Sequence, residues 1–125
     1  MVTGVGIDIV EVDRVAEKIN RGQGFRELVF SASEIEYCES ATHKFEHYAA
    51  RFAAKEAFFK AIGTGWTNGT AFNEIEVVRH QSGKPQLVLS GTTALTLQHL
   101  HGTSIELSLS HTKAMATAIV IIQTT

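Results

Sequence analysis

Glu56 stands out because it lies where a helix would be expected to carry an apolar side chain. At about 100° per residue, one face of segment 45–62 is apolar, and Glu56 falls near its middle, one turn from Phe52 and from Lys60. A buried carboxylate must be paired, hydrogen-bonded or bound to metal, because an isolated buried charge is very costly. Three interpretations stay open: an i, i+4 ion pair with Lys60, a side chain that reaches solvent at the edge of the apolar face, or membership of a binding site.

Asp8 is a second carboxylate in an unusual setting. It lies within residues 5–9, whose alternation predicts a strand, on the face opposite Ile7 and Ile9. Asp is disfavoured in strands, so it is either a ligand, part of a solvated outer face or part of a turn at the end of the strand. Mg²⁺ typically takes one or two carboxylates and completes its shell with waters or substrate phosphates. Asp8 and Glu56 would form such a site only if the fold brings their segments together.

Basic residues and glycine-rich turns accompany the predicted long helix. Amines and exposed backbone N–H groups are what a phosphorylated ligand requires, although a glycine after a helix is also a common way for the helix to end. Residues 82–85 are predicted to form a turn, and contact with a ligand is the less favoured interpretation. The residues concerned are Lys44, Arg51, Lys55, Lys60, Gly63, Thr64, Gly65, Gly83, Lys84 and Pro85.

A basic stripe marks the first predicted helix. Arg14, Lys18 and Arg21 are spaced i, i+4 and i+7, and Arg26 follows closely. In a slightly acidic chain such a stripe either docks an acidic partner or forms an ordinary solvated face.

Ser110 and His111 are adjacent near the end of the chain. Neighbouring residues of a strand point to opposite faces, so they are poorly placed as a nucleophile and its base. Ligand hydrogen bonds or a structural role are the better interpretations.

The elements that must position these side chains follow from periodicity and turn signals. Helices are predicted from Asp13 as N-cap until Gly22 and Gly24 end the first one, from a Ser31/Glu34 capping box to about residue 38, over 45–62, and over 92–101 with Gly102 closing it. Strands are predicted at 5–9, 72–80, 86–89, 105–110 and 115–122, the last two as a hairpin. This order predicts an α+β fold with one antiparallel sheet against a long central helix.

Length and composition narrow the class of protein. The 125 residues suit one domain, 1–125, and the net charge of −2 excludes a generally basic nucleic-acid binder. The single cysteine, the lack of a signal-peptide pattern and the absence of an apolar run of about 18–20 residues predict a cytoplasmic protein that does not insert into membranes.

Four motifs resemble the bacterial holo-acyl-carrier-protein synthases, the short trimeric class of 4′-phosphopantetheinyl transferases. Residues 6–14 (GIDIVEVDR) resemble the opening motif, and 51–65 (RFAAKEAFFKAIGTG) the long central one. Phe30-Ser31 with Glu34 resembles a lesser motif between them. Residues 107–112 (LSLSHT), with Ala116 and Ala118 beyond, resemble the C-terminal block. The likeness covers essentially the whole chain, in order.

The resemblance implies the 4′-phosphopantetheinyl transferase fold and a role for each candidate residue. Asp8 and Glu56 would bind Mg²⁺, and Lys60 would neutralise phosphate charge beside it. Coenzyme A would be held by Lys44, Arg51, Lys60, Gly63, Gly83, Lys84, Pro85, Ser110 and His111. The stripe of Arg14, Lys18, Arg21 and Arg26 would face the acyl carrier protein. Homotrimers with active sites between subunits are typical of this class.

The implied reaction is attack by a carrier-protein serine hydroxyl on the β-phosphate of coenzyme A, with adenosine 3′,5′-bisphosphate as leaving group. Either Glu56 or a metal-bound water would take the serine proton. Two other readings of the residues are another coenzyme A enzyme, which would not need the Asp8/Glu56 pair, and a non-catalytic carrier-binding module resting on the basic stripe alone.

Overall fold

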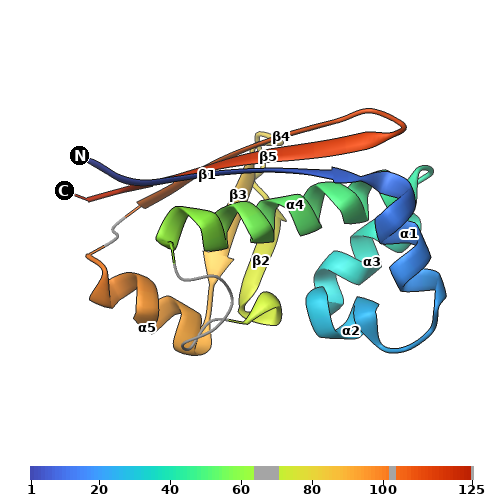
Figure 1. The fold of residues 1–125 in the computed structure, drawn as a ribbon, viewed down its shortest axis with the longest axis horizontal. Coiled ribbons are helices and arrows are strands. Elements are labelled where there is room, and N and C mark those ends of the chain that lie inside the picture. Colours follow the sequence, from blue (N-terminus) through green and yellow to red (C-terminus); the bar gives the residue numbers. More distant parts are fainter. Residues whose placement is uncertain (64–70, 102–103, 125) are drawn as a thin grey trace.

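A long helix lies against one face of a three-stranded antiparallel sheet (Figure 1). The computed structural model describes residues 1–63, 71–101 and 104–124. The strand order is β1-β5-β4, so the two outer strands form the sheet's edges. The sheet consists of β1 (Val2–Glu11), β5 (Met115–Gln123) and β4 (Ser104–His111), and the helix is α4 (Lys44–Ile62).

The remaining elements flank α4 on two sides. Three short helices gather near its N-terminal end, and a separate two-stranded antiparallel sheet and the last helix lie toward the other end (Figure 1). The first group is α1 (Val12–Asn20), α2 (Phe25–Val29) and α3 (Ala32–Ser40). The second is η1 (Phe72–Glu74), β2 (Ile75–Arg79), β3 (Pro85–Leu89) and α5 (Gly91–His99). None of the helices described combines the length and apolarity needed to cross a bilayer.

Glycines let β1 approach α4 at backbone distance. Gly4, Gly6 and Asp8 alternate toward the helix, and a Cβ atom at Gly6 would lie 2.7 Å from the Ala61 nitrogen. Only glycine permits so close an approach. The opposite face of β1 is apolar yet uncovered in the single chain, with Ile7 62% and Ile9 63% exposed. The face carrying Asp8 is therefore the inner one, and the predicted solvated outer face is wrong.

The core surrounds α4 rather than touching one side of it. One cluster, including Ala57, Phe58 and Val120, lies between α4 and the sheets, and a second, including Phe30 and Tyr48, lies between α4 and the short helices. Side chains around nearly the whole circumference of α4 are buried, among them two charged ones, Arg51 and Lys55. The prediction of one apolar face was too narrow, because α4 is enclosed by two layers and, over residues 51–60, only the row of Phe52, Glu56 and Lys60 reaches the surface.

The predicted α+β class, antiparallel pairing and long central helix are confirmed, with local corrections. The strands form two sheets instead of one, α2 was not predicted, and segment 72–80 begins with a 3₁₀ turn. Asp13 is not the N-cap of α1, since Glu11 occupies that position and Asp13 lies in the first turn. The Ser31/Glu34 capping box is present, and Gly63 ends α4 at φ 78°. Gly102 lies outside the described residues.

Candidate functional site

Asp8 and Lys60 meet where β1 crosses α4. Lys60 Nζ lies 2.9 Å from Asp8 Oδ1 and also donates a hydrogen bond to the Ile7 carbonyl oxygen at 3.1 Å. The Asp8 side chain is only 14% exposed. The ammonium therefore pairs with the strand carboxylate, and the predicted alternative of a Glu56–Lys60 ion pair within the helix is wrong.

Glu56 faces the same place and remains uncompensated. Its pKa is raised, chiefly because burial disfavours the charged form and next because the negative charge of Asp8 lies nearby, against smaller opposing effects of Lys60 and Lys18. Among residues 1–63, 71–101 and 104–124, no group donates a hydrogen bond to the Glu56 carboxylate. The fold has thus brought Asp8 and Glu56 close enough to repel each other.

A divalent cation suits this pair of carboxylates. Two negative groups that raise each other's energy are stabilised by a shared positive charge, and oxygen ligands are what Mg²⁺ prefers. Within the described part of the chain no cluster of three or more His, Cys, Asp or Glu side chains has metal-binding geometry. Mg²⁺ does not require such a cluster, because it commonly takes one or two carboxylates and leaves its other positions to water and phosphate.

A second group of side chains centres on Arg51, which is 3% exposed. Its Nε has no hydrogen-bond partner, and its guanidinium lies 4.4 Å from the ring centroid of Tyr37. Arg79 approaches the same ring at 5.6 Å. In the described structure no carboxylate forms an ion pair with either arginine. Two guanidinium groups without acidic partners make a natural phosphate site.

His111 lies at the border of this group. Its ring centroid is 5.4 Å from that of His47, and His47 in turn packs edge-on against Tyr37 at 5.6 Å. His111 Nδ1 is 3.0 Å from Glu46 Oε1. Ser110, the residue before it, is exposed on β4. Tyr37, His47 and Arg79 were not predicted as site residues. The i, i+4 spacing on α4 links His47 to Arg51, whereas only the tertiary fold brings Tyr37 and Arg79 there.

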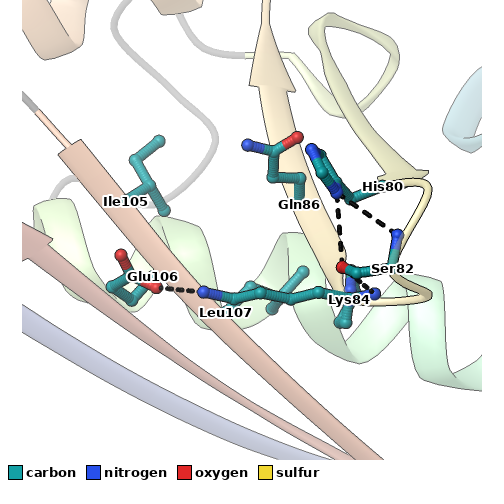
Figure 2. A pocket seen from close by; sticks show the side chains of 8 residues that line it. His80, Ser82, Lys84, Gln86, Ile105, Glu106 and Leu107 are labelled. Carbon is teal, nitrogen blue, oxygen red and sulfur yellow. Dashed lines mark hydrogen bonds and ion pairs between the residues drawn. The ribbon is translucent and has the colours of Figure 1, made fainter.

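The turn between β2 and β3 forms a third group. Gly83 has φ 88°, and Lys84 Nζ reaches across to Glu106 Oε2 on β4 at 3.1 Å, as Figure 2 shows. A cavity of about 290 Å³ lies between this turn and β4. Its lining comprises His80, Ser82, Lys84, Pro85, Gln86, Ile105, Glu106 and Leu107.

These groups do not converge within one chain. Arg51 and Glu56 are five residues apart, which places them about 140° apart around α4. Lys44, bound to Glu39 at 3.2 Å, is separated from Lys60 by about 24 Å of helix. Lys84 lies beside the β4 edge, whereas Asp8 lies on β1 at the opposite edge. Gly63 ends α4 near Lys60, and Thr64 and Gly65 lie outside the described residues.

The basic stripe is only partly free. Arg14 and Lys18 line one cavity of about 330 Å³. Arg21 pairs with Glu17 at 3.0 Å, and Arg26 is held by two carboxylates, Glu27 at 2.7 Å and Glu39 at 3.2 Å. Arg26, which follows the predicted stripe, therefore does not present a free charge.

Lys18 also borders an apolar cavity next to Glu56. Its Nζ lies 5.7 Å from the ring centroid of Phe25 and 5.6 Å from that of Phe52. The cavity has a volume of about 420 Å³ and is lined by Lys18, Phe25, Leu28, Val29, Phe52, Glu56, Ala71, Phe72 and Asn73. An apolar recess thus opens directly beside the carboxylate pair.

Lys55 is not available to a ligand, although it was grouped above with the basic residues that suit phosphate. Its side chain is fully buried and forms an ion pair with Glu34 at 2.6 Å. The glutamate of the capping box therefore has a second role that its position at the start of α3 did not reveal.

Comparisons with known proteins agree with this architecture. Residues 4–119 match the family model of the 4′-phosphopantetheinyl transferase superfamily. Proteins named holo-[acyl-carrier-protein] synthase from Cytophaga hutchinsonii and Solibacter usitatus are 46% and 45% identical, with 97% and 98% of this chain and 97% and 99% of theirs covered.

Solved structures are similar over the same extent. A Neisseria meningitidis holo-[acyl-carrier-protein] synthase has a TM-score of 0.91 at 30% identity, covering 98% of this chain and 99% of that one. The Helicobacter pylori protein of that name, solved in complex with coenzyme A, has a TM-score of 0.84 at 30% identity, covering 95% and 99%. With a family model spanning nearly the whole sequence and relatives of matching length, this chain belongs to the 4′-phosphopantetheinyl transferase superfamily.

Proposed function

We propose that this chain transfers the 4′-phosphopantetheine group of coenzyme A to a serine of apo-acyl carrier protein, in the cytoplasm and with Mg²⁺. The observation that carries the proposal is the Asp8–Glu56 pair with Lys60 beside it, two repelling carboxylates and an ammonium at one point. The relatives named holo-[acyl-carrier-protein] synthase and the coenzyme A complex of the Helicobacter pylori protein support the choice of donor and acceptor.

The reaction needs positioning and charge neutralisation more than covalent help. Asp8 and Glu56 would hold Mg²⁺, which when bound polarises the phosphoryl oxygens. Lys60, 56% exposed at the site, offers its ammonium to the charge that accumulates as the serine oxygen bonds to the β-phosphorus. The bond from that phosphorus to the bridging oxygen breaks, the serine proton is released, and adenosine 3′,5′-bisphosphate leaves.

We further propose that the active site is completed by a neighbouring subunit of a homotrimer. Asp8, Glu56 and Lys60 lie toward the β1 edge, whereas the Arg51 group and the Gly83–Lys84–Pro85 turn lie elsewhere on the same chain. A second copy would supply the missing half. The uncovered apolar face of the three-stranded sheet, with Val5, Ile7 and Ile9 each more than half exposed, is the kind of surface that subunits bury.

A mixing experiment tests the shared site. Glu56→Gln subunits keep the Arg51 group intact, and Arg51→Met subunits keep Glu56 intact. When the two variants are co-refolded in equal amounts and assayed at a coenzyme A concentration too low for Arg51→Met to bind it, random assembly regenerates roughly a quarter of the sites with both halves intact, and activity should return in that proportion. Activity that stays at the level of the separate variants would place each site within one chain. Light scattering after size exclusion reports the assembly itself.

The carrier protein would dock on α1. Lys18 supplies positive charge next to Glu56, Arg14 lies beside Lys18 in a neighbouring cavity, and the apolar cavity is bordered by Lys18, Phe25 and Phe52. Charge attracts an acidic partner and an apolar recess fixes its position. Arg21 and Arg26 would join the contact only by leaving their glutamate partners.

Mass spectrometry of apo-acyl carrier protein tests the activity directly. Incubation with this protein and coenzyme A should add the mass of one phosphopantetheine group with Mg²⁺ and nothing with EDTA. Glu56→Gln should abolish the gain while circular dichroism stays unchanged, whereas Glu36→Gln, an exposed position on α3, should behave as wild type. A full gain in EDTA would refute the metal requirement, and no gain in any condition would refute the transferase.

A further inference from the structure

Lys55 is a fully buried ammonium whose three donors are all used. Its Nζ bonds to Glu34 Oε1 at 2.6 Å, to the Val29 carbonyl oxygen at 2.6 Å and to the Phe72 carbonyl oxygen at 3.2 Å. These acceptors come from α3, the end of α2 and η1, and Lys55 itself from α4. One side chain therefore ties four elements that are distant in sequence.

Glu34 completes the connection. Its Oε1 also accepts from the Ser31 backbone N–H at 2.9 Å, and its Oε2 accepts from the Val77 N–H at 2.9 Å. The Lys55–Glu34 pair is consequently bonded to the start of α3 and to β2 as well. The pair is fully buried and hydrogen-bonded, the condition under which a polar network is rigid.

Two of the three Lys55 acceptors belong to walls of the apolar cavity beside Glu56. Val29 forms part of the α2 wall, and Phe72 part of the η1 wall. The Phe72 ring stacks on Phe52 at 5.8 Å and meets Phe59 edge-on at 5.0 Å, so its backbone position sets how far this aromatic wall stands from α2. Lys55 itself does not line the cavity and is fully buried, so it holds both walls from within the protein.

Stability alone does not explain this arrangement. An apolar pair of similar volume is commonly as stable as a buried ion pair, or more so. What an apolar side chain in place of Lys55 cannot do is hold the Val29 and Phe72 carbonyls at one spacing. The role of the ammonium is therefore to hold these two carbonyl groups, and the cavity walls that carry them, at a fixed distance.

We propose that Lys55, supported by Glu34, is a positioning residue that sets the width of the cavity and thereby the affinity for the acceptor protein, one of whose apolar side chains enters it. The proposal rests on the proposed transferase function. The occupant belongs to the acceptor rather than to coenzyme A, because the rim of this apolar cavity carries Lys18 of the basic stripe that would face the acceptor, whereas the reacting group of coenzyme A is its charged β-phosphate.

The test is the double variant Glu34→Gln/Lys55→Met, assayed as the full chain well below its melting temperature. Gln at position 34 keeps the capping box of α3, and Met matches the unbranched shape of Lys55 without its charge. We expect KM for apo-acyl carrier protein to rise about tenfold, with kcat and KM for coenzyme A within about twofold of wild type. Binding of the carrier, measured by calorimetry without turnover, should weaken by the same factor.

A matched control and a second variant keep the outcome decisive. Ser33→Ala removes a 2.6 Å hydrogen bond to Glu76 in the same region without touching a cavity wall, and should leave every constant unchanged. If the methionine variant does not fold, Glu34→Gln/Lys55→Gln, whose shorter amide cannot span both carbonyls, should show the same rise in KM. A lower melting temperature with unchanged carrier KM and affinity would overturn the proposal. Failure of the wild type to transfer at all would instead refute the proposed function.

Discussion

Replacing Gly6 by alanine tests whether the backbone contact between β1 and α4 positions Asp8. The added Cβ would lie 2.7 Å from the Ala61 nitrogen and closer still to the Ala57 carbonyl oxygen, whereas ordinary contacts begin at 3.4 Å. Clearing the Ala61 nitrogen alone needs about 0.7 Å, and clearing the closer Ala57 oxygen needs more, so the strand must retreat by more than that at Gly6; Asp8 lies only two residues further along the same face. Because both obstacles are helix backbone, a side-chain rotation cannot relieve them.

Two effects of different size should follow. Overpacking of this kind costs about 1–3 kcal/mol of unfolding free energy. A misplacement of about 1 Å at a reacting centre costs about 100-fold in rate, so kcat should fall by about that factor while the protein is still folded. The concentration of Mg²⁺ needed for half-maximal rate should rise as well, because the two carboxylates are no longer held at one distance.

The assay is kcat for phosphopantetheine transfer, followed by mass spectrometry at a temperature where circular dichroism shows a folded protein. Gly24→Ala is the matched control: its φ of 85° makes alanine strained, but a Cβ there meets nothing within 4 Å. It should lose about 1 kcal/mol of stability and keep its kcat. If Gly6→Ala loses stability but keeps wild-type kcat, the close approach serves packing only, and the reasoning is refuted.

Three further changes separate catalysis from stability. Lys60→Ala should lower kcat at least tenfold with little change in melting temperature, because an ammonium that is 56% exposed contributes little to folding. A large fall in melting temperature, or an unchanged kcat, would contradict this. Arg51→Met should raise KM for coenzyme A at least tenfold while the melting temperature stays or increases, since it removes a buried charge without a carboxylate partner; a fall in melting temperature with unchanged KM would show a structural role. The Tyr48 hydroxyl, 2.6 Å from the Glu39 carboxylate, is the main cause of that group's lowered pKa, so the stability it contributes is present at neutral pH and lost as the pH falls through the folded-state pKa. Melting curves from about pH 7 to about pH 3 should therefore fall less steeply for Tyr48→Phe, and an unchanged slope would contradict the assignment.

Much of the secondary structure could be predicted because its determinants are local. The capping box at Ser31 and Glu34, the left-handed glycine at position 63 and the alternation of residues 5–9 act within a few residues. The five-residue helix α2 was not predicted, because such a short segment spans barely one turn of apolar periodicity. The division of the strands into two sheets depends on long-range pairing, which no local pattern contains.

The residues of the candidate site were likewise predicted only in part. Unusual placement alone singled out Glu56 and Asp8, since a carboxylate is unexpected on an apolar helix face and inside a strand. Lys55 shows the limit of such reasoning. As a basic residue next to Glu56 it suits phosphate equally well, yet its side chain points into the protein and meets Glu34, 21 residues earlier.

The sequence by itself determined the elements and the residue types able to bind a metal and a phosphate, because periodicity, capping and charge are properties of short segments. Only the tertiary structure decided which of those residues meet. Packing of β1 onto α4 through Gly4 and Gly6 placed Asp8 beside Lys60 and near Glu56, and helix geometry turned Arg51 to the other side. Contacts between distant segments are set by burial of surfaces in three dimensions, and a candidate site built from such contacts exists only once the chain has folded.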